Sequence, residues 1–133
     1  MSKTVTYRRL VMPKDLNAAN RLFGGTMMAW MDEAAALYAM CQTNSCNIVT
    51  RKVSEIEFTK PVSQGDFLSF EAEITNIGRT SLTVKITAYR KYIGPIPSSS
   101  QRRNGDESVC HCEMVFVTLD SHGTPTPHGL KKD

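Results

Sequence analysis

The segment from Phe23 to Met40, FGGTMMAWMDEAAALYAM, constrains the fold more than any other part of this chain. It is made mostly of good helix formers and contains no proline, so it predicts a helix from Gly25 to about Thr43. Apolar side chains occur nearly all round this helix, which is typical of a buried helix rather than an amphipathic surface one. Such a helix needs a second layer to wrap it, and a concave sheet provides that layer.

The rest of the chain supplies strands. After Asn47 the apolar pattern changes to a period of two, which indicates β-structure. We expect a short strand before the helix and four after it, over residues 4–12, 48–59, 67–76, 80–92 and 109–119. Turn signals at 61–66 (PVSQGD) and at Asn76-Ile77-Gly78 separate the central strands. The predicted fold class is α+β: a long central helix wrapped by a curved antiparallel sheet of about five strands, the last four in a meander.

Length and composition limit the classes of function. The 133 residues favour a single domain over 1–133, and 41% hydrophobic with 22% charged residues is ordinary for a globular protein. The net charge of +3 is too small to indicate nucleic acid, although a small anionic ligand fits it. Asp32 and Glu33 keep the longest apolar run below the roughly 20 residues of a membrane span. The first residues show no signal-peptide core, so we expect a cytoplasmic protein.

Four cysteines raise the question of a metal. In a reducing cytoplasm Cys41, Cys46, Cys110 and Cys112 are expected to be thiols. The run Cys110-His111-Cys112 matches no usual zinc spacing, and in a strand its two cysteines share a face while His111 points away. We therefore expect neither a metal nor another cofactor.

Asp32 is the residue that most needs an explanation. Burying an ionised carboxylate without partners costs several kcal/mol. On a helix Asp32 shares a stripe with Gly25, Ala29 and Ala36, all small, so a ligand or another backbone could approach it. Two interpretations stay open: a helix with one hydrated edge, or a catalytic base.

Gly24 and Gly25 open the predicted helix. The free N–H groups of a helix N-terminus bind anions and could hold the oxyanion of an acyl-transfer intermediate, although plain loop geometry explains the glycines equally. Gly25 and Asp32 are about 10.5 Å apart along a helix axis, too far to act on one carbonyl. If both are catalytic, the site is composite between two subunits, which requires at least a dimer.

Several motifs, in this order along the chain, resemble the acyl-CoA thioesterases of the hotdog-fold superfamily. The similarity is to the branch of bacterial broad-specificity acyl-CoA hydrolases and cytosolic acyl-CoA hydrolases of animals. The motifs are Asp15-Leu16-Asn17, Phe23-Gly24-Gly25, Met31-Asp32-Glu33, Phe58-Thr59-Lys60-Pro61-Val62 with Gly65-Asp66, the turn Gly78-Arg79-Thr80-Ser81, and 115–125.

This resemblance implies a hotdog fold and hydrolysis of acyl-CoA to a free acid and coenzyme A. It implies Asp32 as general base or nucleophile, a Gly25 or Gly24 amide that polarises the thioester carbonyl, and Asn17 as a positioning amide. It further implies a homo-oligomer, a dimer at minimum and then a tetramer or hexamer, with active sites at the dimer interface. Coenzyme A enters only as part of substrate and product.

Some positions depart from the family pattern or are assigned more loosely. Asn20 and Arg21 stand where glycine and a small or polar residue are common, and Ala36 replaces a hydroxyl that can hold water. Thr50 or Ser54 would then hold that water.

For coenzyme A binding we expect Arg79, Thr80 and Ser81 of the turn. Arg51 or Lys60 could also contribute, and Phe58 would pack on the pantetheine arm or in the core. The loop 93–108, with Arg102 and Arg103, is either a solvated surface loop or a phosphate contact.

Two alternatives to hydrolysis remain. A hotdog dehydratase or hydratase needs a histidine beside the helix acid, yet His111, His122 and His128 all lie in the last third of the chain. A non-catalytic acyl-CoA-binding hotdog protein would keep the fold without the turnover.

Overall fold

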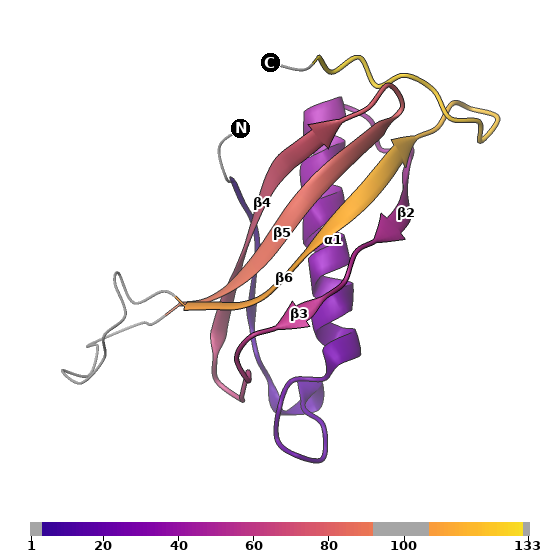
Figure 1. Cartoon of the computed structure of the whole chain (residues 1–133). Coiled ribbons are helices and arrows are strands. Elements are labelled where there is room, and N and C mark those ends of the chain that lie inside the picture. The colour runs from indigo at the N-terminus through magenta and orange to yellow at the C-terminus, as the bar shows by residue number, and fades with distance from the viewer. Residues whose placement is uncertain (1–3, 92–106, 132–133) are drawn as a thin grey trace.

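A computed structural model describes residues 4–91 and 107–131 of the chain. One long helix, α1 (Gly24–Thr43), packs along an antiparallel sheet of six strands (Figure 1). The strands are β1 (Thr4–Leu10), β2 (Ile48–Val53), β3 (Glu57–Phe58), β4 (Phe67–Ile77), β5 (Ser81–Lys91) and β6 (Glu107–Thr118), and a short 3-10 helix, η1, spans Pro13–Asp15. The predicted fold class is confirmed, with one strand more than expected. In the described part of the chain, no helix is both long and apolar enough to cross a membrane.

The order of the strands differs from the expected meander. The sheet runs β1-β4-β5-β6-β2, with β3 also beside β6. Only β4, β5 and β6 follow one another, because the segment expected at 48–59 pairs with β6 and not with β4. Period-two alternation shows that a segment is a strand, but it does not name the neighbour with which the strand pairs.

The strand expected at 48–59 is also broken in two. Between β2 and β3 the chain leaves the ladder for residues 54–56. Ser54 bridges the break: its N–H donates to the Glu113 carbonyl at 2.8 Å, and its Oγ accepts from the Glu113 N–H at 2.7 Å. The hydroxyl therefore takes the place of a backbone partner at the break.

Only one side of α1 is buried. The buried residues are Met27, Trp30, Met31, Ala34, Ala35, Tyr38 and Ala39. On the two flanks of this buried stripe, Met28 is 44% and Leu37 41% exposed, although both are apolar. The prediction of a helix buried all round is thus wrong for a single chain, because one sheet can cover only one side of a helix.

The second acid of the helix, Glu33, has a structural partner. Its carboxylate accepts a hydrogen bond from the Tyr7 hydroxyl of β1 at 3.1 Å. Tyr7 in turn packs edge-on against Phe70, while Arg9 lies over the Trp30 ring at 4.7 Å. Burial, and then the hydrogen bond to Glu33, raise the pKa of the Tyr7 hydroxyl. Glu33 therefore ties the edge strand β1 to α1.

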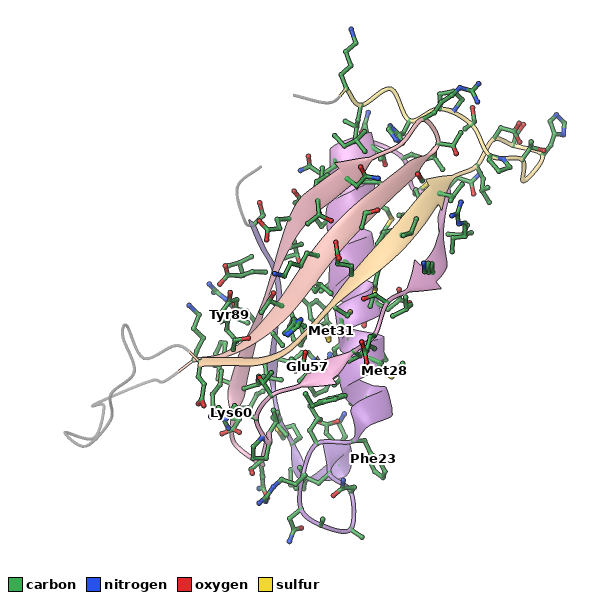
Figure 2. All side chains as sticks on the ribbon, in the orientation of Figure 1. Phe23, Met28, Met31, Glu57, Lys60 and Tyr89 are labelled. Atoms are coloured by element: carbon green, nitrogen blue, oxygen red, sulfur yellow. The ribbon has the colours of Figure 1, made fainter. Side chains whose placement is uncertain are left out.

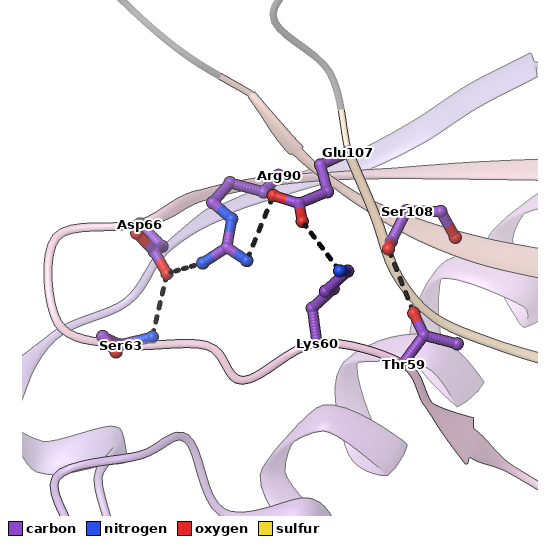
Figure 3. A network of polar contacts seen from close by, with 7 residues as sticks. All are labelled: Thr59, Lys60, Ser63, Asp66, Arg90, Glu107 and Ser108. Carbon is purple, nitrogen blue, oxygen red and sulfur yellow. Dashed lines mark hydrogen bonds and ion pairs between the residues drawn. The ribbon is translucent and has the colours of Figure 1, made fainter. Parts of the chain in front are cut away.

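An ion network fixes the segment that returns from β3 to β4 (Figure 3). Arg90 Nη1 lies 2.7 Å from Asp66 Oδ2, and Arg90 Nη2 lies 3.4 Å from Glu107 Oε2. Asp66 also accepts from the Ser63 N–H at 2.8 Å, within the predicted PVSQGD turn, where Gly65 has φ of 85°. Arg90 thus joins the turn to the start of β6.

We expect Arg90→Met to lower the free energy of unfolding by about 2 kcal/mol, because Asp66 would lose a short charge-assisted hydrogen bond at a largely buried site. Urea unfolding followed by circular dichroism measures this. Arg8→Met, at an exposed position of β1, is the matched control and should stay within about 0.5 kcal/mol of wild type. Equal stability of the Arg90 variant and wild type would show that the network contributes nothing.

Candidate active site

Asp32 lies half-buried on α1, beside the edge strand β2. Thr50 Oγ1 of β2 donates a hydrogen bond to Asp32 Oδ1 at 2.8 Å. The β2–β6 register shifts between Thr50 and Lys52, a bulge-type irregularity that turns side chains locally. The structure therefore brings together the helix acid and the threonine that the sequence suggested separately.

A hollow of about 220 Å³ opens at this acid. Asp32 shares its lining with five apolar residues: Met28, Ala29, Val53, Ile56 and Met114. A carboxylate at the edge of an apolar hollow can meet a substrate that carries an acyl chain next to a reactive carbonyl. Ile56 and Met114 are site residues that the sequence did not reveal, because Ile56 sits in the strand break and Met114 reads as ordinary core.

Cys112 lies close to Asp32 but is not a nucleophile at neutral pH. Burial, followed by the charges of Asp32 and Glu113, raises the pKa of the Cys112 thiol to about 11. Burial, followed by Cys112, likewise raises the pKa of Cys110 to about 12. His111 points the other way and lies 3.6 Å from Glu57, so the predicted alternation of the Cys-His-Cys run is confirmed.

We expect Cys110 and Cys112 to resist a thiol reagent at pH 8 in the folded protein, since both are buried and their thiolates are disfavoured. Mass spectrometry after brief labelling, with and without denaturant, measures which thiols react. The exposed Cys41 is the internal control, because it should react both with and without denaturant. Rapid labelling of Cys112 under native conditions would contradict the described packing around Asp32.

Gly24 and Gly25 form the first turn of α1, at the N-terminal end of the stripe that carries Asp32. The preceding N–H groups are already bonded, Phe23 to the Asp15 carbonyl and Leu22 to the Val62 carbonyl. The N–H groups of Gly24, Gly25 and Thr26 have no acceptor in the helix itself, and the first bonded one is that of Met27, which donates to the Phe23 carbonyl at 3.1 Å. A Cβ on Gly25 would meet nothing within 4 Å, so a ligand has open access to this turn.

Phe58 flanks the same turn. Its ring lies 3.6 Å from the place a Cβ on Gly24 would occupy, and the side chain is 47% exposed. Of the two places expected for Phe58, the structure excludes the core. The ring instead stands on the surface next to the glycine amides.

Asn17 shapes the loop before the glycines. Its side-chain oxygen accepts from the N–H groups of Ala19 at 2.9 Å and Arg21 at 3.1 Å. The positive φ of Asn20, 59°, allows the tight turn between them. Since the oxygen of Asn17 is used inside the loop, its amide nitrogen is the group left to reach a substrate.

Comparison with known proteins gives the family of this chain. The family model of the thioesterase superfamily matches residues 19–94, which include the glycines, Asp32, Thr50 and Phe58. The chain belongs to the thioesterase superfamily. The acyl-CoA thioester hydrolase YciA of Salmonella typhimurium is 32% identical to it over 120 residues, 90% of this chain and 86% of that protein.

Solved structures agree with this assignment. The chain resembles a structure described as a hexameric hotdog fold thioesterase of Campylobacter jejuni, with a TM-score of 0.77 and 26% identity over 92% of this chain and 88% of that one. It also resembles an acyl-CoA hydrolase from Staphylococcus aureus in complex with butyryl coenzyme A, with a TM-score of 0.80 and 30% identity over 94% and 70% of the two chains. The expected hotdog fold of this thioesterase-superfamily chain is confirmed.

Within a single chain, the expected binding residues of this superfamily member do not all lie together. The turn with Arg79, Thr80 and Ser81 joins β4 to β5 at the end of the molecule opposite the start of α1 (Figure 1). The C-terminal tail holds this turn, because His128 Nε2 lies 2.8 Å from the Ser81 carbonyl oxygen. Arg51 is exposed on β2, and Arg102 and Arg103 lie outside the described residues.

Proposed function

We propose that this protein is an acyl-CoA thioesterase, which hydrolyses the thioester of fatty acyl-CoA to a free acid and coenzyme A. The observation that carries the proposal is the Asp32–Thr50 hydrogen bond at the edge of an apolar hollow, in a chain of the thioesterase superfamily. The S. aureus relative is described as an acyl-CoA hydrolase, and structures of it exist with an aspartate or a threonine replaced by alanine.

In the proposed reaction, Asp32 acts as general base on a water molecule or as the nucleophile itself. Thr50 holds one carboxylate oxygen through its hydroxyl and so directs the other oxygen at the reacting atom. The oxygen of water becomes bonded to the carbonyl carbon, the carbon–sulfur bond breaks, and the thiolate of coenzyme A takes a proton. The amides of Gly24 and Gly25 stabilise the oxyanion, with Asn17 positioning carbonyl or water.

The site is proposed to be composite. Gly25 and Asp32 are seven positions apart on one helix, so the Asp32 of one subunit acts with the glycine turn of another. Exposed apolar side chains on α1 and β2 support such a dimer, because Met28, Leu37, Val49 and Val53 are each more than 40% exposed in one chain. β2 ends the sheet on that side, so its outer edge is open to a second copy. The C. jejuni relative is described as hexameric, and we propose a homo-oligomer here, built from dimers.

The same assembly would give the remaining binding residues a role. Phe58 would pack on the pantetheine arm, and the turn Arg79-Thr80-Ser81 would meet the nucleotide end of coenzyme A from a neighbouring subunit or along the length of the helix. The reaction needs no metal and no cofactor in this proposal.

The dehydratase alternative finds no support in the described residues. Within one chain, His111 lies beside Glu57, His128 is bonded to Ser81 and to the Leu130 N–H, and His122 is exposed in the turn after β6. No histidine among the described residues lines the hollow at Asp32. A non-catalytic acyl-CoA-binding protein would make every contact described above, so only a measurement of turnover distinguishes it from a hydrolase.

The deciding experiment is release of free coenzyme A thiol from a panel of acyl-CoAs, from short to long chains, with the purified protein. Steady thiol release that scales with protein concentration supports hydrolysis. Calorimetric binding of acyl-CoA without thiol release would make the protein a binding module, and neither binding nor release would overturn the proposed function.

A further inference from the structure

A second hollow, of about 210 Å³, lies beside the start of α1, apart from the one at Asp32. Its floor is apolar and buried, formed by Leu22, Met27 and Val62. Phe58 stands at its side, and the lining also contains two cations, Arg21 and Lys60, with Thr59 and Pro61. Figure 2 shows Lys60 toward the end of the molecule at which Phe23 leads into α1. The hollow therefore combines an apolar floor with a positive rim.

This hollow adjoins the glycine turn. Phe58, part of its lining, lies 3.6 Å from the Cβ position of Gly24. Arg21 precedes Gly24 by three residues, so their Cα atoms are at most about 11 Å apart. An acyl chain whose carbonyl oxygen rests on the glycine amides can thus extend along the apolar floor and reach the cations within a few bonds.

The cations of the rim are available to an anion. Among the described residues, the exposed guanidinium of Arg21 has no ion pair. Lys60 is 55% exposed and lies 3.9 Å from Glu107, a carboxylate that Arg90 also contacts at 3.4 Å. Arg21 is therefore the stronger candidate, since its planar fork suits a carboxylate.

We propose that this hollow binds an acyl chain of about two to four methylenes that ends in a carboxylate, so that the substrates include CoA esters of short dicarboxylic acids. This proposal rests on the proposed thioesterase function. A hollow of about 210 Å³ has room for a few methylenes and a terminal carboxylate. The methylenes lie on Leu22, Met27 and Val62, and the carboxylate pairs with Arg21.

The phosphates of coenzyme A are the other source of negative charge. The pantetheine arm separates them from the thioester by roughly 15 Å when extended, at about 3.5 Å for every three bonds. The hollow begins beside the amides that hold the carbonyl, so a short acyl arm fits it better than the phosphates do.

The test compares glutaryl-CoA with 5-methylhexanoyl-CoA, whose acyl chain has the same shape but an uncharged end. In wild type, thiol release should favour the glutaryl ester. Arg21→Met should lower kcat/KM for glutaryl-CoA about tenfold, the scale of one charge-assisted hydrogen bond, mainly through KM, and should leave the neutral ester within about twofold. Arg21→Lys should restore part of the loss. Arg8→Met, on β1, should leave kcat/KM unchanged for both esters.

Each other outcome has a definite meaning. Arg21→Met could instead lower kcat/KM equally for both CoA esters and not for the corresponding pantetheine thioesters, which lack the nucleotide. That result would assign Arg21 to the phosphates and overturn the proposal. An unchanged glutaryl rate would also overturn it. Turnover of 5-methylhexanoyl-CoA by wild type upholds the thioesterase function in both cases, whereas no turnover of either ester would overturn the function and this proposal together.

Discussion

Replacing Asp32 by asparagine is expected to lower turnover of acyl-CoA by about 10²-fold or more, the scale of removing a general base or nucleophile. The amide cannot take a proton from water or attack a carbonyl, yet it keeps the shape of the side chain and can still accept the Thr50 hydrogen bond. Initial rates of thiol release, measured at several substrate concentrations, report kcat and KM separately. The loss should lie in kcat, because the apolar lining of the hollow is unchanged.

Glu33→Gln is the matched control for this variant. It neutralises the neighbouring acid of the same helix, but that acid bonds Tyr7 of β1 and faces away from the hollow at Asp32. Turnover should stay within about twofold of wild type, with at most a loss of about 1 kcal/mol in stability. Thr50→Val should fall between the two, since the carboxylate remains but loses its orienting hydroxyl. A near-normal rate for Asp32→Asn would remove the catalytic role from this residue.

Replacing Leu37 by glutamate is expected to dissociate the oligomer and, with it, to abolish most of the activity. Leu37 is 41% exposed in the isolated chain, so a charge there should not disturb the core of the subunit. If the outer side of α1 packs against a second copy, each dimer would bury unpaired carboxylates at a cost of several kcal/mol. Sedimentation velocity over a range of protein concentrations measures the assembly, and thiol release measures its consequence.

Gln42→Glu places the same charge on the same helix, at an exposed position that is already polar. It should leave assembly and activity close to wild type, while circular dichroism should show both variants folded. A Leu37→Glu protein that is monomeric and fully active would contradict the composite site, because each chain would then hold all it needs. An assembled, active variant would place the interface elsewhere on the molecule.

The sequence by itself determined the helix, its acid and the faces of the central strands. The run around Asp32 is helical because of its residue types. β4 and β5 largely alternate buried and more exposed side chains as their period of two predicted, although Ser69 and Thr87, both expected on the polar face, are buried. The start of the helix at the paired glycines and the thiol state of the cysteines were likewise predicted from local chemistry. These properties depend on spacing along a few residues, which a sequence records directly.

Only the tertiary structure decided which segments meet. In the structure β2 pairs with β6 at the edge of the sheet and not with β4 as the meander predicted. This placement brings Thr50 within hydrogen-bonding distance of Asp32. The tertiary structure separated the roles of the two helix acids, since Glu33 meets β1 and Asp32 meets β2. It also joined Arg21 and Lys60, 39 positions apart, at one hollow. Pairing between distant strands depends on chain closure and on the burial of whole faces, and neither is written in the periodicity of any one segment.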